Sequence, residues 1–298
     1  MSNTGTLYLV STPIGNLKDI SQRALETLEN TDLILAEDTR TSSLIFSQLP
    51  LKCKKRFLSY HKFNEQNRLS EIAELLTSGK NIALVSDAGM PCISDPGYLL
   101  VDYLRRKYPD IDIIPLPGAN AALTALIGSG LPTDRFYFAG FIPKKVNDIH
   151  RELASWKTLL EQRCTVITYE APHRLLKTLE ILSTDNYFSA VTLVTARELT
   201  KAHEEFIQGN AKELIEHFTK HNPRGEFVLL LADTSTSNKI QVSPAESPQI
   251  NCETLIDELI NYPLTDKDIY QLCQKLIPAS DLPRKNQVMS MIRYKRNN

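Results

Sequence analysis

The sequence contains no pattern of residues that would hold a metal ion. Its cysteines are few and dispersed, with no Cys-x-x-Cys pair: Cys53, Cys92, Cys164, Cys252 and Cys273. His203 and Glu204 begin an HExxH-like motif, but position 207 is Ile instead of a second histidine. We therefore expect no metal site, and reduced thiols of the kind found in the cytoplasm.

Long apolar runs and an excess of positive charge are also absent. Near the start only Leu7–Val10 is continuously apolar, and no run approaches the roughly 20 residues that cross a bilayer. The formal net charge of −1 excludes a polycation that coats nucleic acid indiscriminately. We expect a soluble, cytoplasmic protein without a membrane partner, whose nucleic-acid contacts, if any, come from local basic patches.

Neither of the common nucleotide-binding fingerprints is present. The first predicted strand, residues 7–10, runs into STPIGNLKDIS at Ser11–Ser21, which matches neither GxGxxG nor a P-loop. This argues against dinucleotide and Walker-type sites. A strand followed at once by Pro13, Gly15 and Asn16 still resembles the opening of a ligand-binding α/β domain.

The sequence does contain a loop rich in Ser, Asp, Gly and Pro directly after a buried strand. Ile82–Val85 is a short apolar run, and Ser86–Gly97 reads SDAGMPCISDPG. Glycine lets backbone approach a ligand closely, and ligands of open α/β sheets bind beyond the carboxyl ends of strands. SDAG or SDPG alone is most often an ordinary turn, but two such segments within ten residues favour a binding loop.

Apolar runs followed by polar residues recur along the chain. They predict strands at residues 7–10, 33–36, 56–60, 82–85, 111–116, 136–141, 164–169, 190–196 and 227–232. We expect an N-terminal α/β domain at 1–117, a C-terminal α/β domain at 118–234, a linker at 235–250 and a small helical, partly basic tail at 251–298. The last segment, Pro283–Asn298, carries basic residues and no acid, which suits RNA binding or a solvated chain end.

Charged residues follow several of these strands. Glu37, Asp38 and Arg40 could form a polar site or a solvated ion-pair cluster. His61 and Lys62 stand beside an aromatic residue, which suits contact with a nucleic-acid backbone or base, or an exposed turn. Comparable groups follow two later strands, at residues 170–174 and 197–205.

Six motifs together resemble the tetrapyrrole methylase family. They read STPIGNLKDIS, AEDTRTS, SDAGMPCISDPG, PGANAALTAL, TYEAPHR and PRGEFVLLL, and the likeness extends from Thr6 to Ala232. Within the family they are most similar to the ribosomal RNA branch, which methylates the ribose 2′-hydroxyl of a decoding-site cytidine in 16S rRNA of the small ribosomal subunit. The resemblance implies two α/β domains with S-adenosylmethionine in the cleft between them, and usually a homodimer.

The resemblance also implies which residues hold the cofactor. The family's Gly-Asp-Pro loop falls on Ser86, Asp87 and Ala88, so only its acid is kept. The implied cofactor-binding residues are Asp87, Gly89, Met90, Asn120, Ala121, Tyr169, Gly225 and Glu226, with Glu170 also contributing from the second domain.

Methyl transfer to a hydroxyl requires in-line alignment, and a base or an oriented cation to activate the oxygen. We predict Glu170, Glu37 and Lys201 as catalytic residues, with Asp38, His173 and Glu198 as further candidates. Arg40, His61, Lys62, Arg174 and Arg197 are predicted to bind the RNA substrate. Two rival functions remain: a methyltransferase for a tetrapyrrole or other small molecule, and a non-catalytic RNA-binding module for ribosome assembly.

Overall fold

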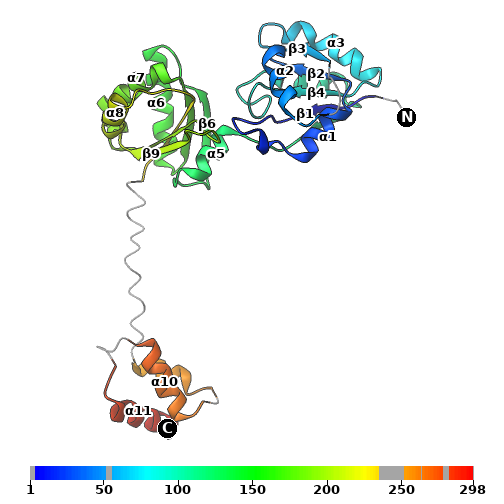
Figure 1. Ribbon diagram of the computed structural model, residues 1–298. Coiled ribbons are helices and arrows are strands. Elements are labelled where there is room, and N and C mark those ends of the chain that lie inside the picture. The colour runs from blue at the N-terminus through cyan, green and yellow to red at the C-terminus, as the bar shows by residue number, and fades with distance from the viewer. Residues whose placement is uncertain (1–3, 52–55, 235–251, 263, 278–281, 298) are drawn as a thin grey trace. The chain divides into compact units, whose positions relative to one another are not determined.

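The computed structural model describes residues 4–51, 56–234, 252–262, 264–277 and 282–297 (Figure 1). The chain divides into two compact units, Met1–Thr234 and Ser235–Asn298. Sequence predictions for Cys53, for the basic residues Lys54 and Lys55, and for the linker at 235–250 lie outside the described residues.

The first half of the larger unit is built on a fully parallel sheet with strand order β3-β2-β4-β1-β5. Its strands are β1 (Leu7–Leu9), β2 (Leu33–Ala36), β3 (Phe57–Ser59), β4 (Ile82–Val85) and β5 (Ile113–Pro115). The connecting helices are α1 (Gln22–Asn30), α2 (Thr39–Gln48), α3 (Glu65–Thr77) and α4 (Tyr98–Lys107), with a 3₁₀ turn η1 (Leu17–Asp19) before α1. Because the strands are parallel, their carboxyl ends lie along one edge of the sheet.

Side chains that follow the strands start the next helices. The Ser21 hydroxyl accepts a hydrogen bond from the Ala24 N–H at 3.1 Å, and the Asp38 carboxylate accepts one from the Arg40 N–H at 2.8 Å. Both satisfy backbone donors that a helix N-terminus leaves without a partner. Every residue of β2 and β4 is buried, as expected for strands covered on both faces.

The second half contains a mixed sheet with strand order β6-β7-β10-β8-β9. Its strands are β6 (Phe136–Phe141), β7 (Thr165–Glu170), β8 (Thr192–Arg197), β9 (Glu205–Gly209) and β10 (Phe227–Ala232). Its helices are α5 (Ala121–Gly128), α6 (Val146–Glu161), α7 (Pro172–Thr184) and α8 (Ala211–Lys220), with a 3₁₀ turn η2 (Phe188–Ala190). β10 lies in the middle of the sheet and pairs antiparallel with both β7 and β8.

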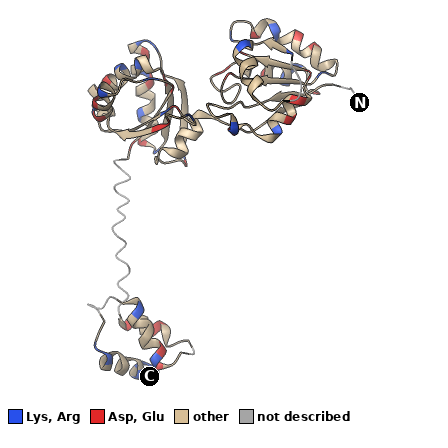
Figure 2. Ribbon diagram, viewed as in Figure 1, with Lys and Arg blue, Asp and Glu red and all other residues tan. Residues whose placement is uncertain are grey.

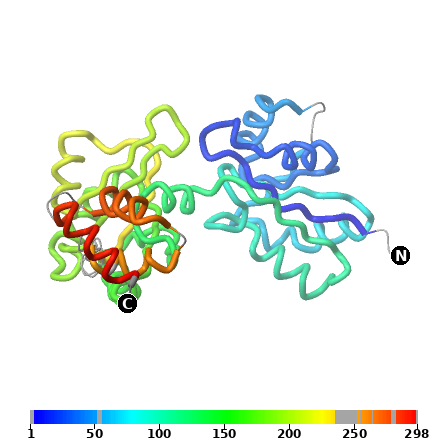
Figure 3. Tube along the Cα trace, turned by 90° about the horizontal axis from the view of Figure 1, so that it is seen from below, coloured from blue at the N-terminus to red at the C-terminus, as the bar shows by residue number. Residues whose placement is uncertain are grey.

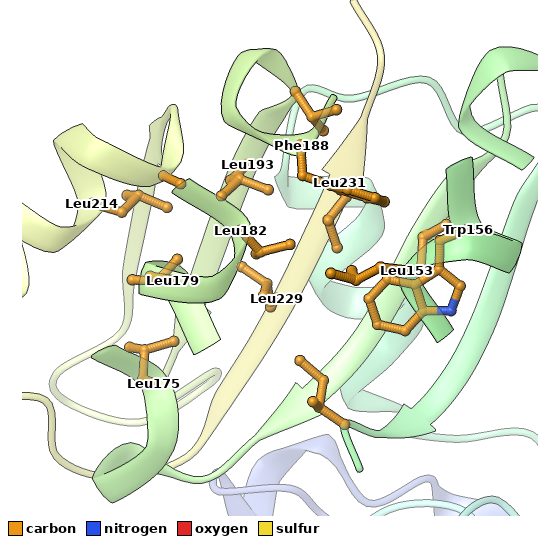
Figure 4. Close-up of a cluster of buried hydrophobic side chains, with 14 of the residues drawn as sticks. Leu153, Trp156, Leu175, Leu179, Leu182, Phe188, Leu193, Leu214, Leu229 and Leu231 are labelled. Atoms are coloured by element: carbon orange, nitrogen blue, oxygen red, sulfur yellow. The ribbon is translucent and has the colours of Figure 1, made fainter. Parts of the chain in front are cut away.

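The two faces of β10 pack against different helices. Leu229 and Leu231 belong to a core that also contains Trp156 of α6, Leu179 of α7 and Leu214 of α8 (Figure 4). The alternate residues of β10 lie in a second core, beside residues of α5. The alternation follows from the two-residue period of a strand, and it explains why all of β10 is apolar and buried.

The described residues of the smaller unit form three helices, α9 (Cys252–Leu259), α10 (Asp266–Leu276) and α11 (Lys285–Asn297), coloured orange to red in Figure 3. Ile256, Ile269, Val288 and Ile292 are fully buried in its core. Figure 2 shows both signs of charge on these helices. Among the described residues of the whole chain, no helix combines the length and apolarity needed to cross a membrane.

The α/β class expected from the sequence is confirmed, while β9 was not expected. β9 is an edge strand that pairs only with β8 among the described strands, and its side chains are partly or fully exposed. An edge strand needs no continuous apolar run, and therefore the pattern used to find the other strands is missing there.

Candidate active site

The loops at the carboxyl edge of the first sheet and the strand ends of the second sheet enclose a cavity of about 410 Å³. This volume lies within the range of ligand sites. From the first half, Ile14 and the loop after β4 line the cavity. From the second half, the start of α5, the ends of β6 and β7 and the start of β10 line it. The structure brings together here the residues predicted to hold a cofactor: Asp87, Gly89, Met90, Asn120, Ala121, Tyr169, Gly225 and Glu226.

The loop between β4 and α4 is held in an unusual backbone conformation. Gly89 exchanges backbone hydrogen bonds with Thr12 at 2.9 and 3.1 Å, which joins this loop to the segment after β1. Cys92 and Ser94 have φ angles of 71° and 66°, in the left-handed region that residues with a Cβ seldom adopt. Strained backbone of this kind is concentrated at functional sites.

The N-terminus of α5 forms the floor of the first half of the cavity. The Asn120 side-chain oxygen accepts a hydrogen bond from the Leu123 N–H at 3.0 Å and so caps the helix. The Asn120 side-chain nitrogen lies 3.6 Å from the Met90 sulfur, across the cavity-lining loops. A motif expected to bind a ligand thus also starts a helix, and one function does not exclude the other.

The cavity is acidic on the side of the first sheet. Asp87 and Asp95 line it, and Glu37 stands behind them at the end of β2. Burial and then the neighbouring Glu37 raise the pKa of Asp95 to about 6. Burial also raises the pKa of Asp87 and of Glu37, the latter with a further contribution from Asp87. The described residues that line the cavity include no Lys, Arg or His.

Glu170 borders the cavity, but its carboxylate is already engaged by three donors. It accepts hydrogen bonds from the Ala171 N–H at 2.7 Å and the Thr178 hydroxyl at 2.5 Å, and an Arg174 nitrogen lies 3.3 Å away. Its side chain is 0% exposed. Arg174 also donates to the carbonyl of Pro143 at 2.7 Å. These contacts favour a role in joining β7 to α7 over proton transfer by Glu170 or phosphate binding by Arg174.

Lys201 sits in a small ion network beside the cavity. Its Nζ lies 3.0 Å from a Glu198 oxygen and 2.8 Å from a Glu226 oxygen. Burial alone would lower the pKa of Lys201, but these two carboxylates raise it above its usual value. Lys201 therefore stays protonated near neutral pH, so it suits an oriented cation and not a base.

Gly225 fits this network only because it has no side chain. Its φ is 86°, and a Cβ there would lie 2.4 Å from Oε1 of Glu198. The same oxygen accepts a hydrogen bond from the Glu226 N–H at 3.0 Å. Glu198 and Thr200 themselves have positive φ angles of 51° and 66°, so the second half also contributes strained backbone at the cavity.

The other residues predicted to act at the site lie outside the cavity lining. Arg40, 90% exposed, pairs with Asp38 at 2.9 Å. Lys62 is exposed at the end of β3, next to His61, whose charge acts on Glu37. Arg197 donates to the Arg224 carbonyl at 2.7 Å and lies 3.4 Å from Glu205.

Sequence reasoning passed over several residues that line the cavity. Asp95, the second aspartate of the loop SDAGMPCISDPG, was not among the predicted site residues. Ile14, Ile93, Phe141 and Leu199 supply apolar wall, and nothing in an apolar residue's own identity marks it as a ligand contact.

The same cavity residues fit S-adenosylmethionine, the cofactor implied by the sequence motifs. This molecule carries a sulfonium and an ammonium group, and the carboxylates of Asp87 and Glu226 line a cavity without cationic side chains among its described residues. A flat adenine suits the apolar wall and the small residues at the start of α5. Gly89 has a φ of 83°, and a Cβ there would come within 3.2 Å of a methyl group of Ile14, so a larger residue would be strained at this point of the lining.

Comparison with known proteins gives consistent relatives. The family model of the tetrapyrrole (corrin/porphyrin) methylases matches residues 6–215. Ribosomal RNA small subunit methyltransferase I of Synechocystis is 43% identical over 94% of this chain and 95% of its own length. The proteins of the same name from Bacillus subtilis and Rickettsia prowazekii are 44% identical over 77% and 76%, and 36% identical over 97% and 97%, of this chain and of their own length respectively.

Solved structures share the fold at much lower identity. The methyltransferase CobJ has a TM-score of 0.58 and 16% identity, over 77% of this chain and 95% of its own. Diphthine synthase has a TM-score of 0.58 and 15% identity, over 76% and 90%. The chain therefore belongs to the tetrapyrrole (corrin/porphyrin) methylase family, and its cofactor is S-adenosylmethionine.

Proposed function

We propose that this chain methylates the ribose 2′-hydroxyl of a cytidine in the decoding region of 16S rRNA, within the small ribosomal subunit. The observation that carries the proposal is the 43% identity to a ribosomal RNA small subunit methyltransferase over nearly the full length of both chains. The solved structures share the fold but are only 15–17% identical in sequence, which gives no reason to transfer their substrates.

The charge distribution supports an RNA substrate. The cavity itself is acidic and suits the cationic methyl donor, whereas exposed cations stand at the carboxyl edge of the first sheet, at Arg40 and Lys62. Phe63, 91% exposed, lies beside them and offers a ring for stacking with a nucleobase. Exposed cations and an aromatic ring after β2 and β3, at the sheet edge that also carries the cavity-lining loop after β4, suit a phosphate-linked acceptor better than a porphyrin.

The bound cofactor supplies an electrophilic methyl group on a sulfonium, and the protein must present the hydroxyl in line with it. The strained loops after β4 and β8 hold the cavity walls in fixed positions, which is the contribution that positioning makes to such a displacement. Glu37 and Lys201 are the predicted catalytic residues whose geometry suits assistance, as a nearby acid and as an oriented cation. Glu170 supports the wall from behind.

The decisive experiment is incubation of the protein with labelled S-adenosylmethionine and small ribosomal subunits that lack the modification, followed by mapping of the methylated nucleotide. We expect a single labelled cytidine in the decoding region, with the methyl group on the ribose. The matched control is Asp87→Ala, which removes a cavity carboxylate and should lower both cofactor affinity and labelling. Labelling of a base, of another RNA or of a small molecule only would contradict the proposal.

The proposed substrate implies where the protein works, and exposed apolar side chains of the second half support a proposal for its oligomeric form. A protein that acts on ribosomal subunits is expected in the cytoplasm. We further propose a homodimer, because exposed apolar side chains gather on α5 and on the edge strand β6: Leu123, Ile127, Phe136 and Tyr137. Among the described strands β6 pairs only with β7, so one of its edges is open for pairing or for cover.

A further inference from the structure

The loop between β4 and α4 places two carboxylates in the cavity, Asp87 and Asp95, and neither forms a salt bridge with a described cation. Among the acids that line the cavity, Glu170 is bound by Arg174 and two other donors, and Glu226 is paired with Lys201. Asp87 accepts a backbone hydrogen bond from Asp38 at 3.4 Å. Asp95 has the hydroxyl of Ser86 within hydrogen-bonding reach, and no salt bridge joins it to a described Lys, Arg or His.

We propose that Asp95 is the general base of the methyl transfer, taking the proton of the ribose hydroxyl as its oxygen attacks the methyl carbon. The inference rests on the proposed function and adds a named catalytic residue to it. In the step, the O–C bond forms and the S–C bond breaks, with its electron pair going to sulfur. The hydroxyl proton passes to the Asp95 carboxylate, and bulk water removes it after product release.

The surroundings of Asp95 suit such a base. Asp95 interacts electrostatically with four titratable groups: Glu37, Asp87, Cys92 and Tyr169. They come from the ends of three strands and from the loop of Asp95 itself. Behind the loop Glu65 of α3 acts on Cys92 as well. Burial and then the nearby carboxylates raise the pKa of Asp95 to about 6, which is closer to neutral pH and suits a general base. An ordinary, well-solvated aspartate would be a weaker proton acceptor.

The position of Asp95 is also held firmly. Ser94, directly before it, has a φ of 66°, and Gly97, two residues after it, has a φ of 133°. A Cβ on Gly97 would lie 2.6 Å from the Cys92 sulfur and 2.7 Å from a Leu84 methyl carbon, so this turn packs tightly against β4. A turn fixed at both ends presents the carboxylate in one place, which general-base catalysis requires.

The test compares Asp95→Asn with the wild-type protein in three measurements. Methylation should fall by about 10²- to 10⁴-fold, the usual contribution of a general base, while calorimetry should show S-adenosylmethionine affinity within about threefold of wild type. The acidic limb of the wild-type pH–rate profile, near pH 6, should disappear in the variant. A variant that keeps its rate, or whose loss of rate follows entirely from weaker cofactor binding, would overturn the assignment.

Substitution of the neighbouring Glu37 distinguishes a catalytic role of Asp95 from a purely structural one. Glu37→Gln removes a negative charge that raises the pKa of Asp95, so the acidic limb should shift to lower pH. An unshifted limb would count against Asp95 as the group that titrates.

The result also separates this proposal from the proposed function. The position of the methyl group on RNA decides the proposed function, whereas the rate ratio can be measured on any hydroxyl acceptor that the wild-type protein modifies. Without any acceptor, infrared difference spectra of wild type against Asp95→Asn still report the carboxyl group. Absence of a carboxyl signal that titrates between about pH 5 and 7 would exclude Asp95 as the base whether or not an RNA target is found.

Discussion

At the scale of single residues, the cavity combines features that lower stability. Asp95 and Asp87 are partly buried acids whose pKa is raised, and Cys92, Ser94, Glu198 and Thr200 have left-handed backbone. Each of these costs free energy in the folded protein without a bound ligand. Such features persist where a function depends on them, and here Asp87, Ser94 and Asp95 line the cavity, while the others lie in the loops after β4 and β8.

The raised pKa of Asp95 predicts a pH-dependent stability. Between the ordinary pKa of 3.8 and about 6 the folded state binds more protons than the unfolded state, so stability falls as pH rises through this window and stays low above it. Asp95→Asn should therefore stabilise the protein at pH 7.5, by up to about 3 kcal/mol, and have little effect at pH 3.5. Urea denaturation at the two pH values measures the difference. An equal change in stability at the two pH values would show that the negative charge of Asp95 does not destabilise the folded protein.

Gly225 offers a test with a matched control. Gly225→Ala places a Cβ against Glu198 and disturbs the contacts of Glu198 with Lys201 and with the Glu226 N–H, so cofactor affinity should fall at least tenfold. Gly130→Ala meets nothing within 4 Å although its φ is also positive, at 72°. It should cost only about 1 kcal/mol of backbone strain and leave affinity unchanged. Calorimetry measures the cofactor affinity of both variants. A similar loss of affinity in both would mean that general backbone strain, and not the contact with Glu198, is the cause.

At the scale of elements, the junction of β7 and α7 organises the second half of the site. Glu170, the last residue of β7, holds the first turns of α7 through the Ala171 N–H, Arg174 and the Thr178 hydroxyl. The sequence motif TYEAPHR therefore encodes a strand end and a helix start in one stretch. Within this motif the Arg174 guanidinium and the Glu170 carboxylate contact each other.

Glu170→Gln tests this interpretation. The glutamine NH₂ group would face hydrogen-bond donors in place of a carboxylate oxygen, and Arg174 would lose its charged partner. The free energy of unfolding should therefore fall by about 2–4 kcal/mol. Denaturant titration measures the loss. The shape of the pH–rate profile should stay that of the wild type, and a profile without its acidic limb would instead identify Glu170 as the base.

The α11 helix calls for charge substitutions in place of deletion. A deletion of residues 283–298 would not isolate an RNA contact, because Val288 and Ile292 of this segment are fully buried and their loss would also destabilise the smaller unit. Lys295 pairs with Asp257 and Arg296 with Asp266, which neutralises part of the basic charge. Arg293→Gln, at a side chain 71% exposed, should reduce the salt dependence of RNA binding with the helix intact. An unchanged salt slope with unchanged circular dichroism would remove this residue from the RNA contacts.

Much of this organisation could be predicted from the sequence, because the buried parallel strands are continuous apolar runs with polar residues at their ends. The roles of individual acids could not. Glu170 and Asp95 both stand in polar loops, but only the fold shows that Thr178 approaches the first and that Glu37 lies near the second. β9 was missed for a related reason, since an edge strand is defined by its partner and not by its own composition.

At the scale of the whole molecule, the proposed dimer makes a measurable prediction. Ile127 of α5 is 79% exposed, an unusual position for a large apolar side chain on a helix that packs its other face on β10. Ile127→Glu should convert a dimer to a monomer, because a charge would have to be buried in the contact. Light scattering gives the mass, and Leu44→Glu, at an apolar side chain 63% exposed on α2, is the control. A wild-type monomer would contradict the proposal directly.

The chain order of the second sheet has a consequence for synthesis. β10, the central strand, is the last of the five to be synthesised. Until it emerges, the edges of β7 and β8 that pair with it in the folded sheet are unpaired. Phe227 and Val228 of this strand also complete the cavity wall. A nascent chain therefore cannot form the complete cofactor cavity before nearly all of residues 1–234 have left the exit tunnel. An unfinished chain would remain inactive while it is still attached to the ribosome that is translating it.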